Sequence, residues 1–158
     1  MKFDHDNISP LDSRYANKIS ELRENFSESA LIKIRFNIEI EWLLYICVNL
    51  PKTFKPLSKQ SIKKIAKFKD SFDNKSILKI KKIESITNHD VKAVEYYIRD
   101  QFLKDKVLST YTHLIHFGLT SEDINSLSYA HMIKNGISIY IMKLDKVNKI
   151  LKNYSKKW

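Results

Sequence analysis

The spacing of apolar residues along the chain predicts a series of helices. Between Ser27 and Pro51 the apolar side chains recur every three or four positions, which is the period of an amphipathic helix, and Ser27 is a suitable residue to cap its start. The stripe that this spacing selects consists of Leu31, Ile34, Ile38, Trp42 and Tyr45. Residues 1–17 are rich in turn-forming side chains, so we expect extended or loop structure there.

Further helices are predicted after the connector "PKTFKP". Residues 58–70 and 75–86 have narrow apolar stripes with lysines on the other faces, as in solvated helices. Residues 91–102 carry a stripe of their own, which makes 87–90 the start of that helix. A short helix over about 106–117 is expected to run into Gly118, since glycine commonly ends a helix in the left-handed conformation. The three stripes are Ile62 and Ile65; Ile77, Ile80 and Ile83; and Val91, Val94, Ile98 and Phe102.

The last predicted helix begins at Thr120 or Ser121 and meets no proline before the end of the sequence. Its apolar positions form a heptad seam. About 35 helical residues span about 52 Å, whereas a compact domain of this size is about 40 Å across. We therefore expect the seam to be covered by partner helices, from another copy or from a further C-terminal part. The alternative is a break at Gly136 that folds the helix back. The seam comprises Ile133, Ile137, Tyr140, Leu144, Val147, Leu151 and Tyr154.

Composition supports an all-α fold, because two glycines and three prolines are too few for the turns of a β protein. We predict an N-terminal helical domain over 1–118 and the first long helix of a helical bundle over 119–158. The single cysteine, Cys47, excludes an internal disulfide and is expected in the core. Its apolar run is too short to span a membrane, and the N-terminus has no apolar signal segment. A cytoplasmic protein without a membrane partner is therefore expected.

The net charge of +10 raises the question of a nucleic-acid partner. Only four of the 28 basic residues are arginine, the residue that favours bidentate contacts to bases and phosphates. The lysines are also spread along the chain. Nucleic-acid binding is therefore not favoured, although a basic helical nucleic-acid binder stays an alternative.

Two predicted helices open on similar polar sequences, "TNHD" at 87–90 and "TSED" at 120–123. A helix start has unpaired N–H groups and partial positive charge, and it suits a carboxylate or a phosphate. Both sequences also suit ordinary caps, and Thr120 with Asp123 resembles a capping box. If Asp90 contacts His89, its carboxylate would raise the pKa of the imidazole.

Other chemistry is less supported by the sequence. Arg14 and Tyr15 lie in a predicted turn and could bind a phosphate. His113 and His116 share a helix face, but further metal ligands are lacking, so no metal site is predicted. Glycine-rich phosphate loops and hydrolase nucleophile motifs are absent from the sequence.

Three blocks of the sequence, in one order, closely resemble the bacterial type of adenylosuccinate lyase. The resemblance runs from about residue 8 to about residue 150, and the last block is also similar to the wider fumarase and aspartase superfamily. The blocks are "ISPLDSRYANKISELRENFSESALIKIRFNIEIEWL", "IESITNHDVKAVEYYI" and "HFGLTSEDINSLSYAHMIK".

The resemblance implies an enzyme of purine biosynthesis. The family releases fumarate from adenylosuccinate, giving AMP, and from a succinyl-carboxamide intermediate, and it uses no metal or organic cofactor. Its members are homotetramers with a central helical bundle, in which three subunits contribute to each active site.

The resemblance also implies roles for residues of this chain. Arg14 and Tyr15 correspond to contacts with the substrate phosphate. Asn88, His89 and Asp90 correspond to a substrate-binding block. Thr120 and Ser121 correspond to residues that hold the succinyl carboxylates, so the resemblance favours an anion site at "TSED".

The chain departs from the family pattern in two respects. Ser13 stands where the family usually has glycine, which would strain the turn before Arg14 if that position needs a positive φ. The family's catalytic histidine and serine lie in segments that these 158 residues do not include. No catalytic residue is therefore assigned, and we expect the chain alone to be inactive. An alternative role is that of an assembly or binding partner.

Overall fold

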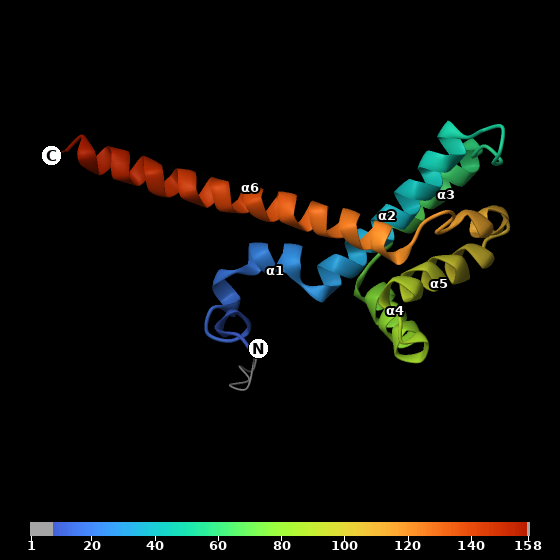
Figure 1. Ribbon diagram of the computed structural model, residues 1–158, viewed down its shortest axis with the longest axis horizontal. Coiled ribbons are helices and arrows are strands. Elements are labelled where there is room, and N and C mark those ends of the chain that lie inside the picture. Colours follow the sequence, from blue (N-terminus) through green and yellow to red (C-terminus); the bar gives the residue numbers. More distant parts are fainter. Residues whose placement is uncertain (1–7, 158) are drawn as a thin grey trace. The chain divides into compact units, whose positions relative to one another are not determined.

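The computed structural model describes residues 8–157, and within that range the chain forms helices and no strand (Figure 1). The predicted all-α fold is confirmed. The chain divides into two compact units, one formed by residues 31–129 and the other by 1–30 together with 130–158. Within the described residues, no helix combines the length and apolarity needed to cross a membrane. The predicted division at 118/119 stays a prediction.

The first long helix, α2 (Glu28–Asn49), lies where its apolar pattern predicted, and the Ser27 hydroxyl caps it by accepting from the Ala30 N–H at 3.2 Å. The predicted buried stripe is wrong, since its member Tyr45 is 57% exposed. The helix is apolar on most of its surface, so periodicity alone does not select the buried face. The most buried apolar side chains of α2 are Ile32, Phe36, Ile40, Leu43, Ile46 and Cys47.

Three further helices complete most of the larger unit: α3 (Lys59–Asp70), α4 (Asn74–Thr87) and α5 (Asp90–Leu103). Side chains cap each of their starts; the Ser58 hydroxyl, for example, accepts from Ser61 N–H at 3.0 Å. Helices α4 and α5 pack against each other (Figure 1). The predicted stripe of α5 is completely buried, and it joins a core in which Phe36 contacts several aromatic rings. The stripe residues are Val91, Val94, Ile98 and Phe102.

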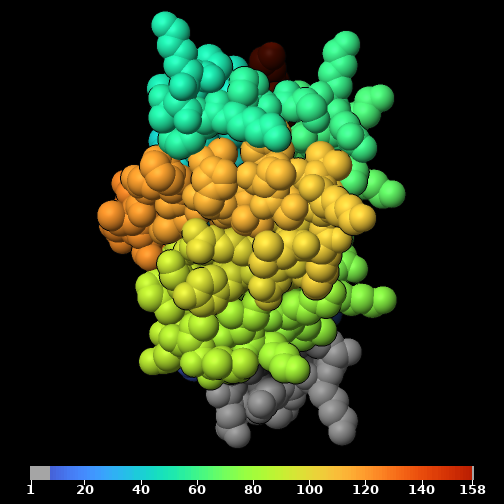
Figure 2. Space-filling view, turned by 90° about the vertical axis from the view of Figure 1, so that its right-hand side faces the viewer, coloured from blue at the N-terminus to red at the C-terminus, as the bar shows by residue number. Residues whose placement is uncertain are grey.

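The prediction of a helix over 106–117 is wrong, because the structure has only a short 3-10 helix, η3 (Leu108–Leu114). Polar side chains compete for the local backbone: the Asp105 carboxylate accepts from two N–H groups, at 2.8 and 3.2 Å. Three hydroxyls bond to carbonyls three residues earlier. The segment is anchored by the Tyr111 hydroxyl, which donates to the Pro56 carbonyl at 3.1 Å. Figure 2 shows the surface that this segment forms between α5 and the 50–60 connector.

In the other unit, the described part of the N-terminal segment forms two 3-10 turns, η1 (Pro10–Asp12) and η2 (Ala16–Lys18). A short helix, α1 (Ser20–Phe26), follows them, and the apolar pattern did not predict it. The rest of the predicted irregular segment, residues 1–7, lies outside the described residues. Ser13 has a φ of −121°, so a positive φ does not strain this turn.

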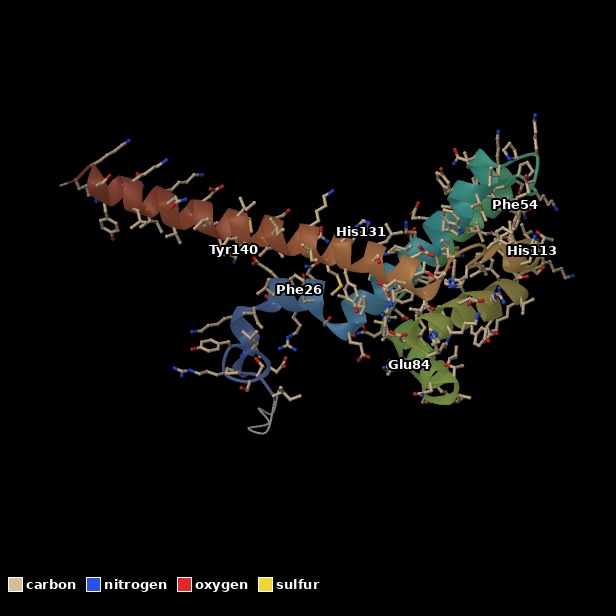
Figure 3. The ribbon with its side chains drawn as sticks, viewed as in Figure 1. Phe26, Phe54, Glu84, His113, His131 and Tyr140 are labelled. Atoms are coloured by element: carbon tan, nitrogen blue, oxygen red, sulfur yellow. The ribbon has the colours of Figure 1, made fainter. Side chains whose placement is uncertain are left out.

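The last helix, α6 (Ser121–Ser155), is continuous, and the alternative of a break at Gly136 is wrong. Phe26, at the end of α1, lies beside α6 (Figure 3). A Cβ added at Gly136 of α6 would clash with the ring of Phe26. Close by, Asn25 Nδ2 donates to the Met132 carbonyl at 2.8 Å. The missing side chain therefore allows two helices to approach closely, rather than bending one of them.

The predicted heptad seam of α6 is exposed along its length. Its seven side chains are between 43% (Leu144) and 67% (Tyr140) exposed. Within the described residues, the chain does not itself bury this face.

Candidate functional site

The start of α5 carries the first group of predicted site residues. Asn88 ends α4 in the left-handed conformation, with a φ of 50°, and its N–H donates to the Glu84 carbonyl at 2.8 Å. His89 caps α5: its Nδ1 accepts from the Lys92 N–H at 3.3 Å. Because Nδ1 accepts, a neutral His89 has its proton on Nε2. The ring therefore presents an N–H donor on the side away from its own helix.

The start of α6 carries the second group. Thr120 caps the helix and forms the predicted box with Asp123, whose carboxylate accepts from the Thr120 N–H at 2.7 Å and from its hydroxyl at 2.9 Å. These bonds lower the pKa of Asp123. Ser121, the first residue of the helix, is not part of this box. Its Oγ lies 3.4 Å from His89 Nε2.

The structure thus brings the two predicted helix starts together within the larger unit. The His89–Ser121 contact joins groups 32 positions apart in the sequence. Both side chains reach solvent, so they are accessible to a ligand. The hydroxyl of Thr120, in contrast, is used by the cap.

Asp90 is held by partners on both carboxylate oxygens. Oδ1 accepts from the Val91 N–H at 2.8 Å, and Oδ2 lies 2.7 Å from Nη2 of Arg35 on α2. Burial raises the pKa of Asp90, but the Val91 N–H and the Arg35 charge outweigh it, so the net shift is downward. The contact with His89 that the sequence left open is long: Asp90 Oδ1 lies 3.7 Å from His89 Nδ1, and this nitrogen accepts from the Lys92 N–H.

Sequence reasoning missed the groups that hold these helix starts. Arg35 Nη2 also donates to Asn125 Oδ1 on α6, at 2.8 Å. Glu39, one turn further along α2, accepts from His116 Nδ1 at 2.6 Å. The indole of Trp42 donates to the Phe117 carbonyl at 2.8 Å. A signal was present in the sequence: Arg35 and Glu39 are opposite charges at i and i+4 of one predicted helix, so they share one of its faces.

The segment before α6 has a strained backbone that these contacts support. His116 has a φ of 61°, which is uncommon for a residue with a side chain, and Gly118 has a φ of 69°, as predicted. The hydrogen bond to Glu39 raises the pKa of His116; burial opposes this, and the charges of Glu39 and Glu95 reinforce it. His116 is thus engaged with a carboxylate rather than facing His113 as a metal ligand. Within residues 8–157, no cluster of three or more candidate ligands is suited to a metal ion.

We expect the pair of His116 and Glu39 to make folding stability depend on pH. The pKa of His116 is raised in the folded state, so its stabilising contribution is complete below the ordinary value of 6.5 and is lost as pH rises through the folded-state value. Urea unfolding from about pH 6 to about pH 9 tests this. His116→Asn is the control, because asparagine tolerates the positive φ and does not titrate. A stability difference between the two proteins that is constant with pH would contradict the prediction.

Arg14 and Tyr15 belong to the other unit. The Arg14 guanidinium lies 5.5 Å from the centre of the Tyr15 ring, and Lys18 Nζ lies 5.9 Å from it. Tyr15 is 38% exposed. The turn therefore presents two cations beside one ring, and its predicted contact with a substrate phosphate stays a prediction.

The curated proteins to which this chain is similar are lyases. Specifically, they are adenylosuccinate lyases, and they confirm the resemblance seen in the motifs. The chain is 40% identical over 151 residues to the enzyme of Buchnera aphidicola from Schizaphis graminum, 43% over 133 residues to that of Legionella pneumophila strain Corby, and 40% over 128 residues to that of Escherichia coli K12.

These matches cover 94%, 83% and 80% of this chain, but 33%, 29% and 28% of the relatives. The chain thus spans about a third of the length of the curated relatives it matches. No protein-family model matches the sequence.

Proposed function

We propose that this chain forms part of the substrate site of an adenylosuccinate lyase, which eliminates fumarate from adenylosuccinate to give AMP and from the succinyl-carboxamide intermediate of purine biosynthesis. The observation that carries the proposal is the contact of His89 Nε2 with Ser121 Oγ at 3.4 Å. It joins two helix starts in a chain that is similar to adenylosuccinate lyases over most of its length.

The helix starts suit the anionic groups of this substrate. Each contributes partial positive charge, and the Nε2–H of His89 and the hydroxyl of Ser121 add donors. Elimination builds negative charge on a carboxylate as the neighbouring carbon loses its proton. Donors fixed in that direction stabilise the transition state more than the ground state, which is the requirement for catalysis.

The described residues supply binding rather than proton transfer in this proposal. The carboxylates at the helix starts have protein partners: Asp90 contacts Arg35 and the Val91 N–H, Asp123 contacts Thr120, and Glu122 accepts from the Ser126 hydroxyl. We assign no general acid or base to this chain. Asn88 is proposed to contact the substrate as part of the substrate-binding block. Arg14 and Tyr15 are proposed to contact the substrate phosphate.

The exposed seam of α6 supports association with further helices, either of other copies in a homotetramer or of a further part of the same protein. Seven apolar side chains in heptad register are 43–67% exposed. Sedimentation of the chain as a monomer at all accessible concentrations would argue against association between copies.

We expect the purified 158-residue chain by itself not to release fumarate from adenylosuccinate. Where the gene encodes a longer protein, that encoded protein is expected to release it. Incubation of each with adenylosuccinate, followed by measurement of fumarate, tests the proposal. Turnover by the 158 residues above the solvent background would show that the acid and base lie within them. Absence of turnover in the encoded protein would contradict the proposed activity.

A further inference from the structure

Two charged side chains of α2, one turn apart, are almost completely buried beneath the paired helix starts. The side chain of Arg35 is 5% exposed and that of Glu39 is 0% exposed. One nitrogen of Arg35, Nη2, bonds to Asp90 at the start of α5 and to Asn125 near the start of α6. Glu39 holds His116, in the segment that leads into α6.

Stability alone is a poor explanation for this arrangement. Burial of Arg35 and of Glu39 costs the removal of each charge from water, and apolar residues of similar volume often stabilise a core as well or better. Here the charges are not fully satisfied: within the described residues, Arg35 Nε and Glu39 Oε2 have no hydrogen-bond partner. What the two side chains do fix is position, since each contact ends on a residue at or beside a helix start.

We propose that Arg35 and Glu39 are positioning residues, which hold the starts of α5 and α6 so that His89 and Ser121 face one ligand. Arg35 contacts both helices through a single nitrogen, so a displacement of one helix start would also displace the other. Glu39 holds the segment before α6 in its unusual backbone conformation. The inference rests on the proposed function and goes beyond it, because it gives a role to two buried side chains rather than to groups exposed to a ligand.

The inference also changes the role of Asp90 within the site. Both of its oxygens are occupied, by the Val91 N–H and by Arg35. Asp90 therefore acts as the anchor of α5 rather than as a ligand contact. A free carboxylate at this place would repel an anionic substrate, and the positive charge of Arg35 offsets the negative charge of Asp90.

The decisive experiment is a double-mutant cycle in the encoded protein, with Arg35→Met, Asp90→Asn and the double variant. The misplacement of the helix starts is expected to lower kcat/KM for adenylosuccinate by about 100-fold in each single variant. The double variant is expected to have about the same kcat/KM as Arg35→Met alone, because Arg35→Met already removes the contact with Asp90. Lys64→Met is the matched control. It removes the 2.5 Å ion pair with Asp105, which lies in the same unit just after the C-terminal end of α5, and it should leave kcat/KM unchanged.

Two results would overturn the inference. One is a folded Arg35→Met protein with undiminished kcat/KM. The other is effects of Arg35→Met and Asp90→Asn that multiply, which would indicate that Asp90 acts on the substrate independently. Glu39→Gln supplies a further arm, since it keeps the shape of the side chain but not its charge, and it should reduce kcat/KM as well.

Amide exchange separates this inference from the proposed function. Arg35→Met should accelerate exchange at the starts of both α5 and α6, whereas Lys64→Met should accelerate neither. If the unmodified encoded protein does not cleave adenylosuccinate, the proposed function fails, and exchange then decides the positioning role by itself. Acceleration at only one helix start would contradict it.

Discussion

Replacement of Phe36 by alanine is expected to lower the free energy of unfolding of the chain by about 3–5 kcal/mol, the usual cost of removing a buried aromatic ring. Phe36 is 0% exposed, and its ring centre lies 4.2 Å from that of Phe72 and 5.3 Å from that of Phe68. It joins α2 to α3 and to the turn that follows α3. The loss therefore includes contacts to more than one element as well as the burial of the ring itself.

Chemical denaturation followed by circular dichroism measures this effect. Ile86→Ala is the matched control, since Ile86 is also a large apolar residue but is 78% exposed, and its replacement should change stability by about 0.5 kcal/mol or less. Phe36→Leu should fall between the two because it leaves a smaller cavity. Equal effects of the replacements at positions 36 and 86 would show that the core is not where the structure has it.

The positions of the longer helices could be predicted from the sequence because their signals are local. The stripe of α5 and the cap of α6 depend on residues within a few positions of one another, and both predictions are confirmed. The buried face of α2 could not be predicted, since the helix is apolar on most of its surface. Which face is buried depends on the packing of α3, α4 and α5 against it. The segment 106–117 failed for another reason: Asp105 and three hydroxyls satisfy its backbone locally.

The candidate site shows the same limit. The two residues proposed to face the ligand, His89 and Ser121, lie in short motifs that can be recognised in the sequence. The supports of the site are contacts between distant positions: Arg35 lies 90 residues from Asn125, and Glu39 lies 77 residues from His116. Spacing along one helix indicates that two charges share a face, but it does not say which partners they meet. Those partners follow from the packing of three helices, which only the structure provides.

Under the proposed function, replacement of Ser121 by alanine in the encoded protein is expected to lower kcat for the cleavage of adenylosuccinate by about 100- to 1,000-fold, the usual effect of losing one donor to a developing negative charge. The reason is its place: Ser121 opens α6, it is not used by the cap, and its Oγ lies 3.4 Å from His89 Nε2. If the hydroxyl acts mainly in the transition state, kcat and kcat/KM should fall together while KM changes little.

Ser126→Ala is the matched control for Ser121→Ala. Ser126 lies on the same helix, and its exposed hydroxyl donates to Glu122 at 3.1 Å, so its loss should leave the kinetics near those of the unmodified protein. Thr120→Ala separates catalysis from capping: loss of the cap should cost about 0.5–2 kcal/mol of stability. Steady-state kinetics and unfolding measurements on all three variants distinguish a role of the Ser121 hydroxyl in catalysis from a role in helix stability. A Ser121→Ala protein with a raised KM and an unchanged kcat would assign the hydroxyl to ground-state binding, since only an interaction that strengthens in the transition state accelerates the elimination.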